Sequence, residues 1–178
     1  MMKKIIFYVL IFLAGCTDPD IPVVEITPVY AEPDPIALFL GQTRWPCSSD
    51  GCADGEAIDR IANSIWAASE KHDLSVPLLV GVLMVENPWL DTTAVSYAGA
   101  MGLYQVMPLH EDEWGCEGTM QSVDGSVCRG ASVLSDMMQR YGNERDALLG
   151  YNGCRSTGCQ SYHGKVVARS EQFSGLDS

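Results

Sequence analysis

Positively charged side chains are scarce in this sequence, and that scarcity limits its partners. The 178 residues include 11 Lys and Arg against 23 Asp and Glu, so the formal net charge is −12. Because binding to a phosphate backbone requires a basic patch or stripe, we expect no nucleic-acid partner. Convincing strand alternation and internal repeats are also missing. The periodicity that is present is helical, so we predict a mainly α protein.

The sequence also lacks an apolar run long enough to cross a bilayer. Residues 5–13 are apolar or aromatic throughout and follow Lys3 and Lys4, which is typical of a signal peptide for export. The run ends in Leu13-Ala14-Gly15-Cys16, which resembles the lipobox of bacterial lipoprotein precursors. That resemblance implies cleavage before Cys16 and acylation of this cysteine. An ordinary cleaved signal followed by a chance cysteine is the alternative.

The remaining six cysteines fall into three close pairs. These are Cys47 and Cys52, Cys116 and Cys128, and Cys154 and Cys159. An exported chain in an oxidising compartment favours disulfides, and local pairing is the simplest hypothesis, although six cysteines allow fifteen connectivities. A zinc site is the alternative, but no pair has CxxC spacing, and the three histidines His72, His110 and His163 show no ligand spacing. We therefore expect neither a metal nor a cofactor.

Composition divides the chain into a signal peptide, a tether, one domain and a tail. After a signal over residues 1–15, the segment 17–35 contains five prolines and five acidic residues but no basic one. Such a composition favours an extended chain, so we predict a lipidated tether over residues 16–44. A single folded domain over residues 45–170 fits the remaining length, with a short tail over 171–178.

Apolar residues at helical spacing predict the helices of that domain. One helix follows a possible N-cap at Asp54, and a second, from Ser75 to Glu86, has Pro77 in its first turn. A third has an apolar face over residues 133–141 and ends at Gly142, and shorter helices are expected over 146–151 and around 162–167. These helices together make the predicted mainly α domain.

The stretch from Leu78 to Trp89 reads LLVGVLMVENPW and places one charge, Glu86, at the end of an apolar helix. A buried carboxylate without a partner is costly, and burial shifts its pKa upward. Glu86 is therefore either the point where the helix reaches the surface or a group whose proton is used.

Residues 86–108 carry the most specific pattern in the sequence. In order, its elements are Glu86, Ala94-Val95-Ser96, Gly99-Ala100-Met101-Gly102-Leu103 and Gln105-Val106-Met107-Pro108. Farther along, GYNGC occupies residues 150–154, and Tyr162 is followed by Val166. Together these elements resemble the signature of the SLT-type lytic transglycosylases. That family shares a lysozyme-like fold with the goose-type lysozymes, so the resemblance implies a single lysozyme-like domain.

The sequence departs from the family pattern at four places. Asn87 stands where Ser usually follows the catalytic Glu, and Tyr104 stands where Met is usual. The spacing from Glu86 to Ser96 is one residue longer than the common pattern, and Cys154 replaces a small residue. These differences concern the geometry around the site more than the reaction class.

The resemblance implies an enzyme that cleaves the β-1,4 bond between N-acetylmuramic acid (MurNAc) and N-acetylglucosamine (GlcNAc) in peptidoglycan without water. Glu86 would act first as acid and then as base, leaving a 1,6-anhydro-MurNAc end. The substrate-binding residues implied are Ser96, Gln105, Met107, Tyr151 and Asn152. Glycosidases more often use two carboxylates, and the chain offers further acids at Asp91 and residues 111–113, which we interpret as solvated.

Two alternatives remain open for the function. One is a muramidase that hydrolyses the same bond, and the other is a non-catalytic peptidoglycan-binding lipoprotein of the envelope. The expected location is the periplasm-facing surface of a membrane, and Thr17 directly after Cys16 favours the outer membrane because the commonest inner-membrane retention signal is an Asp there. The sequence leaves open whether the protein serves growth, a secretion or conjugation machine of the envelope, or a phage.

We predict that the mature protein is lipidated at Cys16. Several acyl chains, each contributing about 0.8 kcal/mol per buried CH₂, would anchor the chain stably. Cys16→Ala should therefore yield an unprocessed precursor or a soluble product, which membrane fractionation and intact mass measure. An unmodified Cys16 in the native protein would contradict the prediction.

Overall fold

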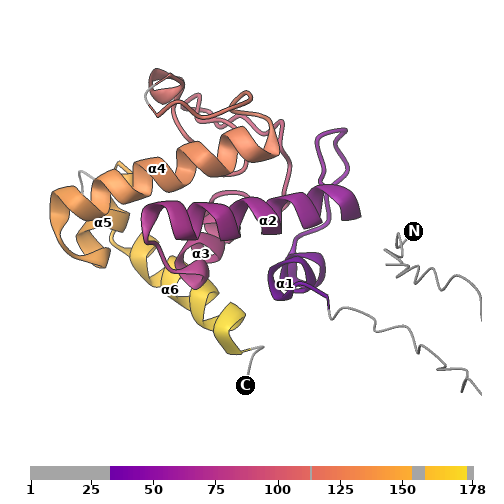
Figure 1. Cartoon of the computed structure of the whole chain (residues 1–178), viewed down its shortest axis with the longest axis horizontal. Helices are drawn as coiled ribbons and strands as arrows, with labels where there is room; N and C mark the ends of the chain where they lie inside the picture. Colours follow the sequence, from indigo (N-terminus) through magenta and orange to yellow (C-terminus); the bar gives the residue numbers. More distant parts are fainter. Residues whose placement is uncertain (1–32, 113, 154–158, 176–178) are drawn as a thin grey trace, which may run out of the picture. The chain divides into compact units, whose positions relative to one another are not determined.

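The computed structural model describes residues 33–112, 114–153 and 159–175. In these residues the chain forms α-helices, one 3-10 helix and isolated β-bridges, with no strand. The elements are α1 (Pro35–Thr43), α2 (Gly55–His72), α3 (Val76–Glu86), η1 (Pro108–His110), α4 (Val123–Tyr141), α5 (Glu144–Tyr151) and α6 (Ser161–Ser174) (Figure 1). The mainly α class that the sequence predicts is confirmed.

Helices α2 and α4 lie side by side and form one layer of the domain (Figure 1). The Asp54 side chain accepts a hydrogen bond from Ala57 N, so it caps α2 as predicted. Helix α4 ends at Gly142 as predicted but begins at Val123, about ten residues before the predicted apolar face. Its first half was missed because small residues such as Ser126, Gly130 and Ser132 are buried there. Small residues permit close packing without producing an apolar periodicity.

Helix α3 is the centre of the domain. Its residues from Leu78 to Met84 are all buried, which explains why the helix is apolar on every side. Helix α6 packs closely against it, and the crossing occurs at Gly81, where a Cβ atom would overlap Ser170 Oγ and lie 2.8 Å from the carbonyl oxygen of Val166. Because Glu86 contacts Tyr162 farther along, the two helices run antiparallel, and this crossing sets their register.

The domain begins ten residues earlier than predicted. Residues 35–43, assigned to the tether, form helix α1, whose Ile36, Phe39 and Leu40 are fully buried. Five prolines suggested an extended chain, but Pro35 occupies the first turn of α1, where a missing N–H costs little, and Asp34 caps the helix. The prediction that the tether reaches residue 44 is therefore wrong.

The C-terminal boundary is corrected in the same way. Helix α6 continues to Ser174, so residues 171–174, assigned to a tail, belong to the domain. Phe173 is buried and packs edge-to-face against Phe39 of α1, with ring centroids 5.4 Å apart. The first and last helices therefore contact each other through an aromatic pair.

Two of the three predicted disulfides are formed within the described residues. Cys47–Cys52 closes the loop between α1 and α2, and Cys116–Cys128 ties the loop before α4 to that helix. The third predicted pair includes Cys154, which lies outside the described residues, so that pairing stays a prediction.

The predicted signal peptide, Cys16 and the tether up to residue 32 also lie outside the described residues. None of the helices in the described part of the chain combines the length and the apolar character needed to cross a membrane.

We predict that Gly81→Ala destabilises the domain. The new methyl group would meet Ser170 and the Val166 carbonyl group, and overpacking of this kind costs about 1–3 kcal/mol. The matched control is Gly164→Ala on α6, where a Cβ atom meets nothing within 4 Å. Urea unfolding should show a loss of stability for Gly81→Ala and none for Gly164→Ala. Equal stabilities of the two variants would contradict the close crossing of α3 and α6.

Candidate active site

Glu86 is the last residue of α3 and is only partly exposed. Tyr162 of α6 donates a hydrogen bond from its hydroxyl to Glu86 Oε1, at 2.5 Å. Burial raises the pKa of Glu86 from 4.5 to about 7, and the hydrogen bond from Tyr162 offsets part of that shift. At neutral pH the carboxyl group is thus close to half protonated, which suits a group that both donates and accepts a proton.

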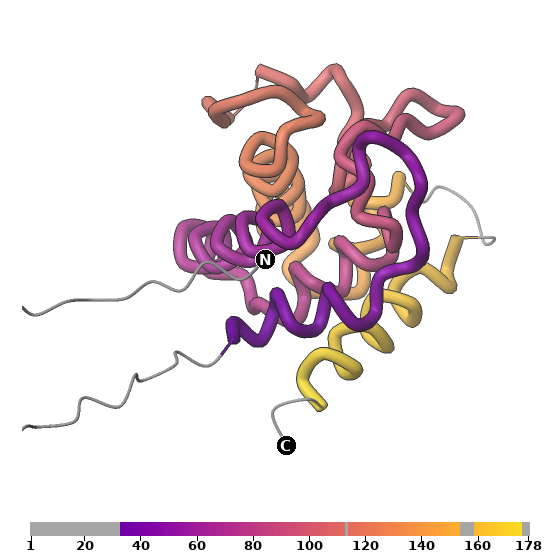
Figure 2. The backbone as a smooth tube through the Cα atoms, turned by 90° about the vertical axis from the view of Figure 1, so that its right-hand side faces the viewer, coloured from indigo at the N-terminus to yellow at the C-terminus, as the bar shows by residue number. Residues whose placement is uncertain are grey.

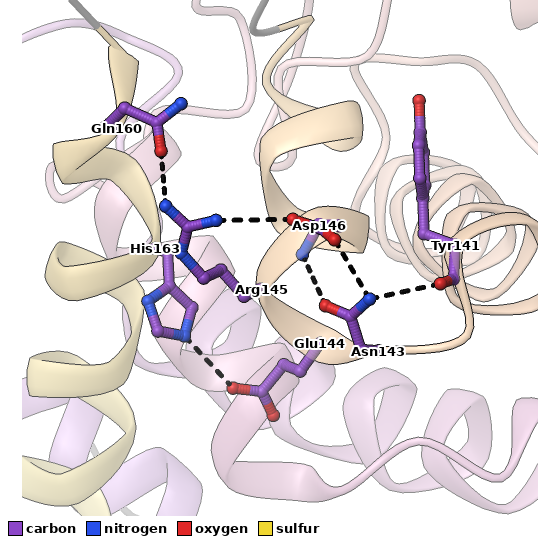
Figure 3. Close-up of polar contacts among 7 residues, drawn as sticks. All are labelled: Tyr141, Asn143, Glu144, Arg145, Asp146, Gln160 and His163. Carbon is purple, nitrogen blue, oxygen red and sulfur yellow. Dashed lines mark hydrogen bonds and ion pairs between the residues drawn. The ribbon is translucent and has the colours of Figure 1, made fainter. Parts of the chain in front are cut away.

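Two features of α6 hold Tyr162 beside Glu86. The first is the register with α3, set by the crossing at Gly81. The second is a set of polar contacts between α5 and the start of α6: Arg145 Nη2 donates to Gln160 Oε1 at 2.5 Å, and His163 Nε2 lies 3.9 Å from Glu144 Oε1 (Figure 3). Because Gln160 and His163 flank Tyr162 in sequence, these contacts fix the turn that carries its side chain.

The Tyr162 phenol stays a hydrogen-bond donor across the working pH range. Burial, followed by the charge of Glu86, raises its pKa well above 10. Tyr162 belongs to the sequence pattern through its spacing to Val166, but that pattern does not place it at the site. Its pairing with Glu86 depends on the packing of two helices and could not be read from local sequence.

Among the predicted binding residues, Tyr151 is the one whose pKa is affected by the charge of Glu86. Its pKa is raised first by burial and then by the charge of Glu86, so the two groups are close enough to interact. The Tyr151 hydroxyl donates to the carbonyl oxygen of Tyr104 at 2.7 Å. Asn152 follows as the C-cap of α5, and its side chain is exposed. Tyr151 is therefore half-buried against the core, whereas Asn152 is exposed.

Tyr104 connects this group to the central helix. Its hydroxyl donates to the carbonyl oxygen of Leu79 in α3 at 3.0 Å, and its backbone N–H donates to Ser126 Oγ in α4 at 3.2 Å. The ring packs directly against Gly130, where a Cβ atom would overlap it. The unusual tyrosine at this position is thus accommodated because α4 has a glycine opposite it.

Asn87, the other departure next to the site, braces the chain that follows Glu86. This side chain is buried, donates to the carbonyl oxygens of Asp91 (2.6 Å) and Gly102 (3.2 Å), and accepts from Asp91 N at 3.1 Å. The amide can make these three bonds because its nitrogen donates two hydrogen bonds and its oxygen accepts one. A serine side chain is shorter and carries a single hydroxyl group. The Asn87 side chain therefore joins Asp91 and Gly102 to the end of α3.

Ser96 and Gln105 both lie in a compact loop over residues 94–106. Ser96 Oγ accepts from Ala100 N at 2.9 Å, and the Gln105 amide nitrogen donates to the carbonyl oxygens of Gly102 (2.9 Å) and Ala94 (3.4 Å). These side chains thus stabilise the loop in the present structure. Met107, at the end of the loop, is 37% exposed and offers an apolar contact. Their role in binding substrate stays a prediction.

Asp91 is the acidic residue nearest to Glu86 in sequence, and its carboxylate is hydrogen-bonded to neighbouring loop residues. Its two carboxylate oxygens accept from Ser49 Oγ (2.6 Å) and from Thr93 N and Oγ1 (2.8 and 2.7 Å). Burial raises its pKa, but these hydrogen bonds outweigh burial, and the net shift is downward. Glu111 and Asp112 are solvent-exposed, and Glu113 lies outside the described residues. Asp91 therefore acts as a structural carboxylate that stays charged.

A metal is not indicated by the arrangement of the described side chains, because they contain no cluster of three or more His, Cys, Asp or Glu placed to hold one. What the residues around Glu86 can do chemically is exchange a proton in a partly dry environment.

We predict that Glu86→Gln stabilises the domain at pH 8 but not at pH 4. Below the unfolded pKa of 4.5 the carboxyl group is neutral in both states, and above about 7 the folded state must hold a buried charge. The contribution of Glu86 to the free energy of unfolding should therefore fall between these values by roughly 2–3 kcal/mol, and this fall should be absent from Glu86→Gln. Urea unfolding at both pH values measures this.

The control is Glu70→Gln, which removes the same charge from an exposed position on α2. It should leave the difference between pH 4 and pH 8 as it is in the wild type. A Glu86→Gln variant with the same pH dependence as the wild type would contradict the burial of this carboxylate.

Comparison with known proteins agrees with this geometry. The model of the family described as Transglycosylase SLT domain matches residues 63–163, more than half of the chain. The chain is also 33% identical over 109 residues to a protein named transglycosylase from Enterobacteria phage PRD1, and the matched region covers 58% of this chain and 40% of that protein. The chain therefore spans less than half of that relative's length. The mainly helical fold and the family match lead to one conclusion: this chain belongs to the transglycosylase SLT domain family.

Proposed function

We propose that the protein is a lytic transglycosylase that cleaves the MurNAc–GlcNAc β-1,4 bond of peptidoglycan and leaves 1,6-anhydro-MurNAc ends. The observation that carries the proposal is the position of Glu86, a partly buried carboxyl group with a pKa of about 7 and a tyrosine hydroxyl bonded to it. Membership of the SLT domain family supports the same substrate class. The phage relative's name, transglycosylase, supports the reaction class.

In the first step, protonated Glu86 gives its proton to the oxygen that bridges the two sugars, and the bond from that oxygen to C1 of MurNAc breaks. The N-acetyl group of the substrate stabilises C1 in place of a second carboxylate. The new charge on Glu86 develops next to the Tyr162 hydroxyl, whose hydrogen bond favours the charged form. Tyr162 thereby assists proton release without giving up its own proton.

In the second step, the Glu86 carboxylate takes the proton from the C6 hydroxyl of the same MurNAc. The C6 oxygen then bonds to C1, which closes the anhydro ring, and no water is consumed. Glu86 returns to its protonated form, so one carboxyl group completes the cycle as acid and then base. A pKa near neutrality serves both roles, because neither protonation state is strongly disfavoured.

The hydrogen bonds that Asp91 accepts within the protein support a mechanism in which Glu86 is the single catalytic carboxyl group. A second catalytic carboxylate would need a free oxygen directed at the sugar or at a water. Both Asp91 oxygens are occupied by Ser49 and Thr93. We assign the binding of the sugar rings to Ser96, Gln105, Met107, Tyr151 and Asn152, through the loop and the α5 terminus that carry them.

We also propose that the domain works at a membrane surface, attached through an acylated Cys16 and a tether. The support is the signal-like N-terminus and the resemblance of residues 13–16 to a lipobox. With the domain starting at Pro35, residues 17–34 remain as the tether, and 18 extended residues reach about 60 Å. That reach would let the domain act on glycan strands away from the lipid.

We predict that Glu86→Gln lowers glycan cleavage by about 10³-fold or more, because it removes the titrating proton while keeping the shape. Purified sacculi are digested with each protein, and the released muropeptides are analysed by mass spectrometry. The wild type should release products one water lighter than those of hydrolysis, with anhydro ends. Glu111→Gln and Asp112→Asn should retain activity, since both side chains are exposed.

Three outcomes would contradict the proposal. Products carrying the added water would identify a hydrolase, and no release of fragments by the wild type would identify a binding protein. Near-normal activity of Glu86→Gln would remove this residue from the mechanism.

A further inference from the structure

The loop between α1 and α2, residues 44–54, lies against the chain that follows Glu86. Trp45 N donates to the carbonyl oxygen of Pro88 at 2.7 Å, and Ala53 N donates to that of Leu90 at 3.0 Å. Figure 2 shows this loop arching over the later segment. The Cys47–Cys52 disulfide closes the loop between these two contacts. The family match covers residues 63–163, so this loop lies outside the matched residues.

This contact brings two exposed tryptophans together. The rings of Trp45 and Trp89 have centroids 5.1 Å apart and meet edge to face, at an interplanar angle of 88°. Trp45 is 47% exposed and Trp89 is 43% exposed. Tryptophan is on average highly buried, so two neighbouring indoles that are each nearly half exposed indicate a binding surface. We call this pair the tryptophan surface.

A hollow adjoins Trp45. It has a volume of about 490 Å³, and its lining includes Arg44, Trp45, Pro46, Ala53 and Asp54. Volumes of about 300–1,000 Å³ are usual for small-molecule sites. The lining combines the indole of Trp45 with the side chains of Arg44, which donates to the carbonyl oxygen of Ala53, and of Asp54, whose Oδ1 caps α2. The other guanidinium N–H groups and the second carboxylate oxygen have hydrogen-bonding capacity for sugar hydroxyls.

We propose that the tryptophan surface is an additional subsite for a neutral N-acetylhexosamine ring of the glycan strand bound at Glu86; this rests on the proposed function. A pyranose ring presents several C–H groups on one side, and these favour the electron-rich face of an indole. Its hydroxyl and acetamido groups point outward from the ring edge. They can reach the polar groups of the adjoining hollow.

Position favours the glycan strand as the occupant. Trp89 is three residues after Glu86, so their Cα atoms are at most about 11 Å apart. A polymeric substrate whose scissile bond lies at Glu86 continues past it on both sides, and the Trp89 backbone lies within that distance of Glu86, with the Trp45 ring packed on the Trp89 ring. An anionic lipid surface is a poorer partner, because the chain carries a net charge of −12.

The test compares Trp45→Ala, Trp89→Ala and the double variant with the wild type. Binding of a GlcNAc tetramer is measured by calorimetry in a Glu86→Gln background, so that cleavage plays no part. We expect the double variant to weaken binding roughly tenfold, equivalent to about 1.4 kcal/mol. On long glycan strands the same change in active protein should raise KM and leave kcat nearly unchanged, because the reacting groups are untouched.

Trp66→Ala is the matched control. Trp66 is 42% exposed on α2 and lies 12 residues beyond Asp54, about 18 Å along the helix. It should leave tetramer binding and KM unchanged. Trp45→Phe, which keeps an aromatic face, should recover most of the binding lost in Trp45→Ala. Thermal unfolding of each oxidised variant verifies that the domain is folded.

Unchanged tetramer affinity in the folded double variant would overturn the subsite. A loss of binding to neutral phosphatidylcholine vesicles with unchanged tetramer binding would also overturn it and identify a membrane contact. The two proposals can fail separately. If the wild type binds the tetramer through the tryptophans but does not cleave glycan, the proposed enzyme activity is wrong and the sugar site stands. If the wild type forms anhydro products but the double variant binds the tetramer normally, the sugar site is wrong and the enzyme activity stands.

Discussion

A carboxyl group at the end of an otherwise apolar helix needs support from elsewhere in the fold, and in this domain Tyr162 of α6 provides it. The hydrogen bond from its hydroxyl to Glu86 Oε1 joins two helices that are far apart in sequence. Burial alone would push the pKa of Glu86 higher, and Tyr162 limits that rise so that the value is about 7. Much of the surrounding structure serves to keep this pair together in a partly dry place.

Contacts from several parts of the domain hold α3, and the segment that follows it, in position for that pair. Helix α6 crosses it closely at Gly81, which sets the register that brings Tyr162 to Glu86. Tyr104 binds the backbone of α3 through Leu79 and receives the Tyr151 hydroxyl in turn, so α5 is joined to the same point. Asn87 braces the loop after the helix, and the disulfide-closed loop over residues 44–54 packs on that segment from outside. The region around Glu86 is thus held by contacts from α5, α6 and the loops on either side of the segment that follows it.

The sequence predicted those features that depend on local pattern. The apolar run that ends at Glu86, the caps at Asp54 and Gly142 and the disulfides of Cys47–Cys52 and Cys116–Cys128 all follow from neighbouring residues. Helix α1 was missed because the prolines and acids of residues 17–35 suggested a tether, although Ile36, Phe39 and Leu40 do have helical spacing. The partner of Glu86 lies 76 residues away, and only helix packing reveals it. The amide of Gln105 was expected to face a substrate, and its bonds to the loop depend on a backbone with φ of 47° that sequence does not disclose.

The proposed acid and base roles of Glu86 depend on one quantity, the pKa of its carboxyl group in the folded protein. Carbon-13 NMR of the intact domain, labelled at the glutamate carboxyl carbons, measures it directly, and the resonance that disappears in Glu86→Gln identifies the residue. The account predicts a titration midpoint near pH 7 for that resonance, in keeping with burial beside Tyr162. A midpoint near 4.5, the ordinary value of a glutamate, would contradict it.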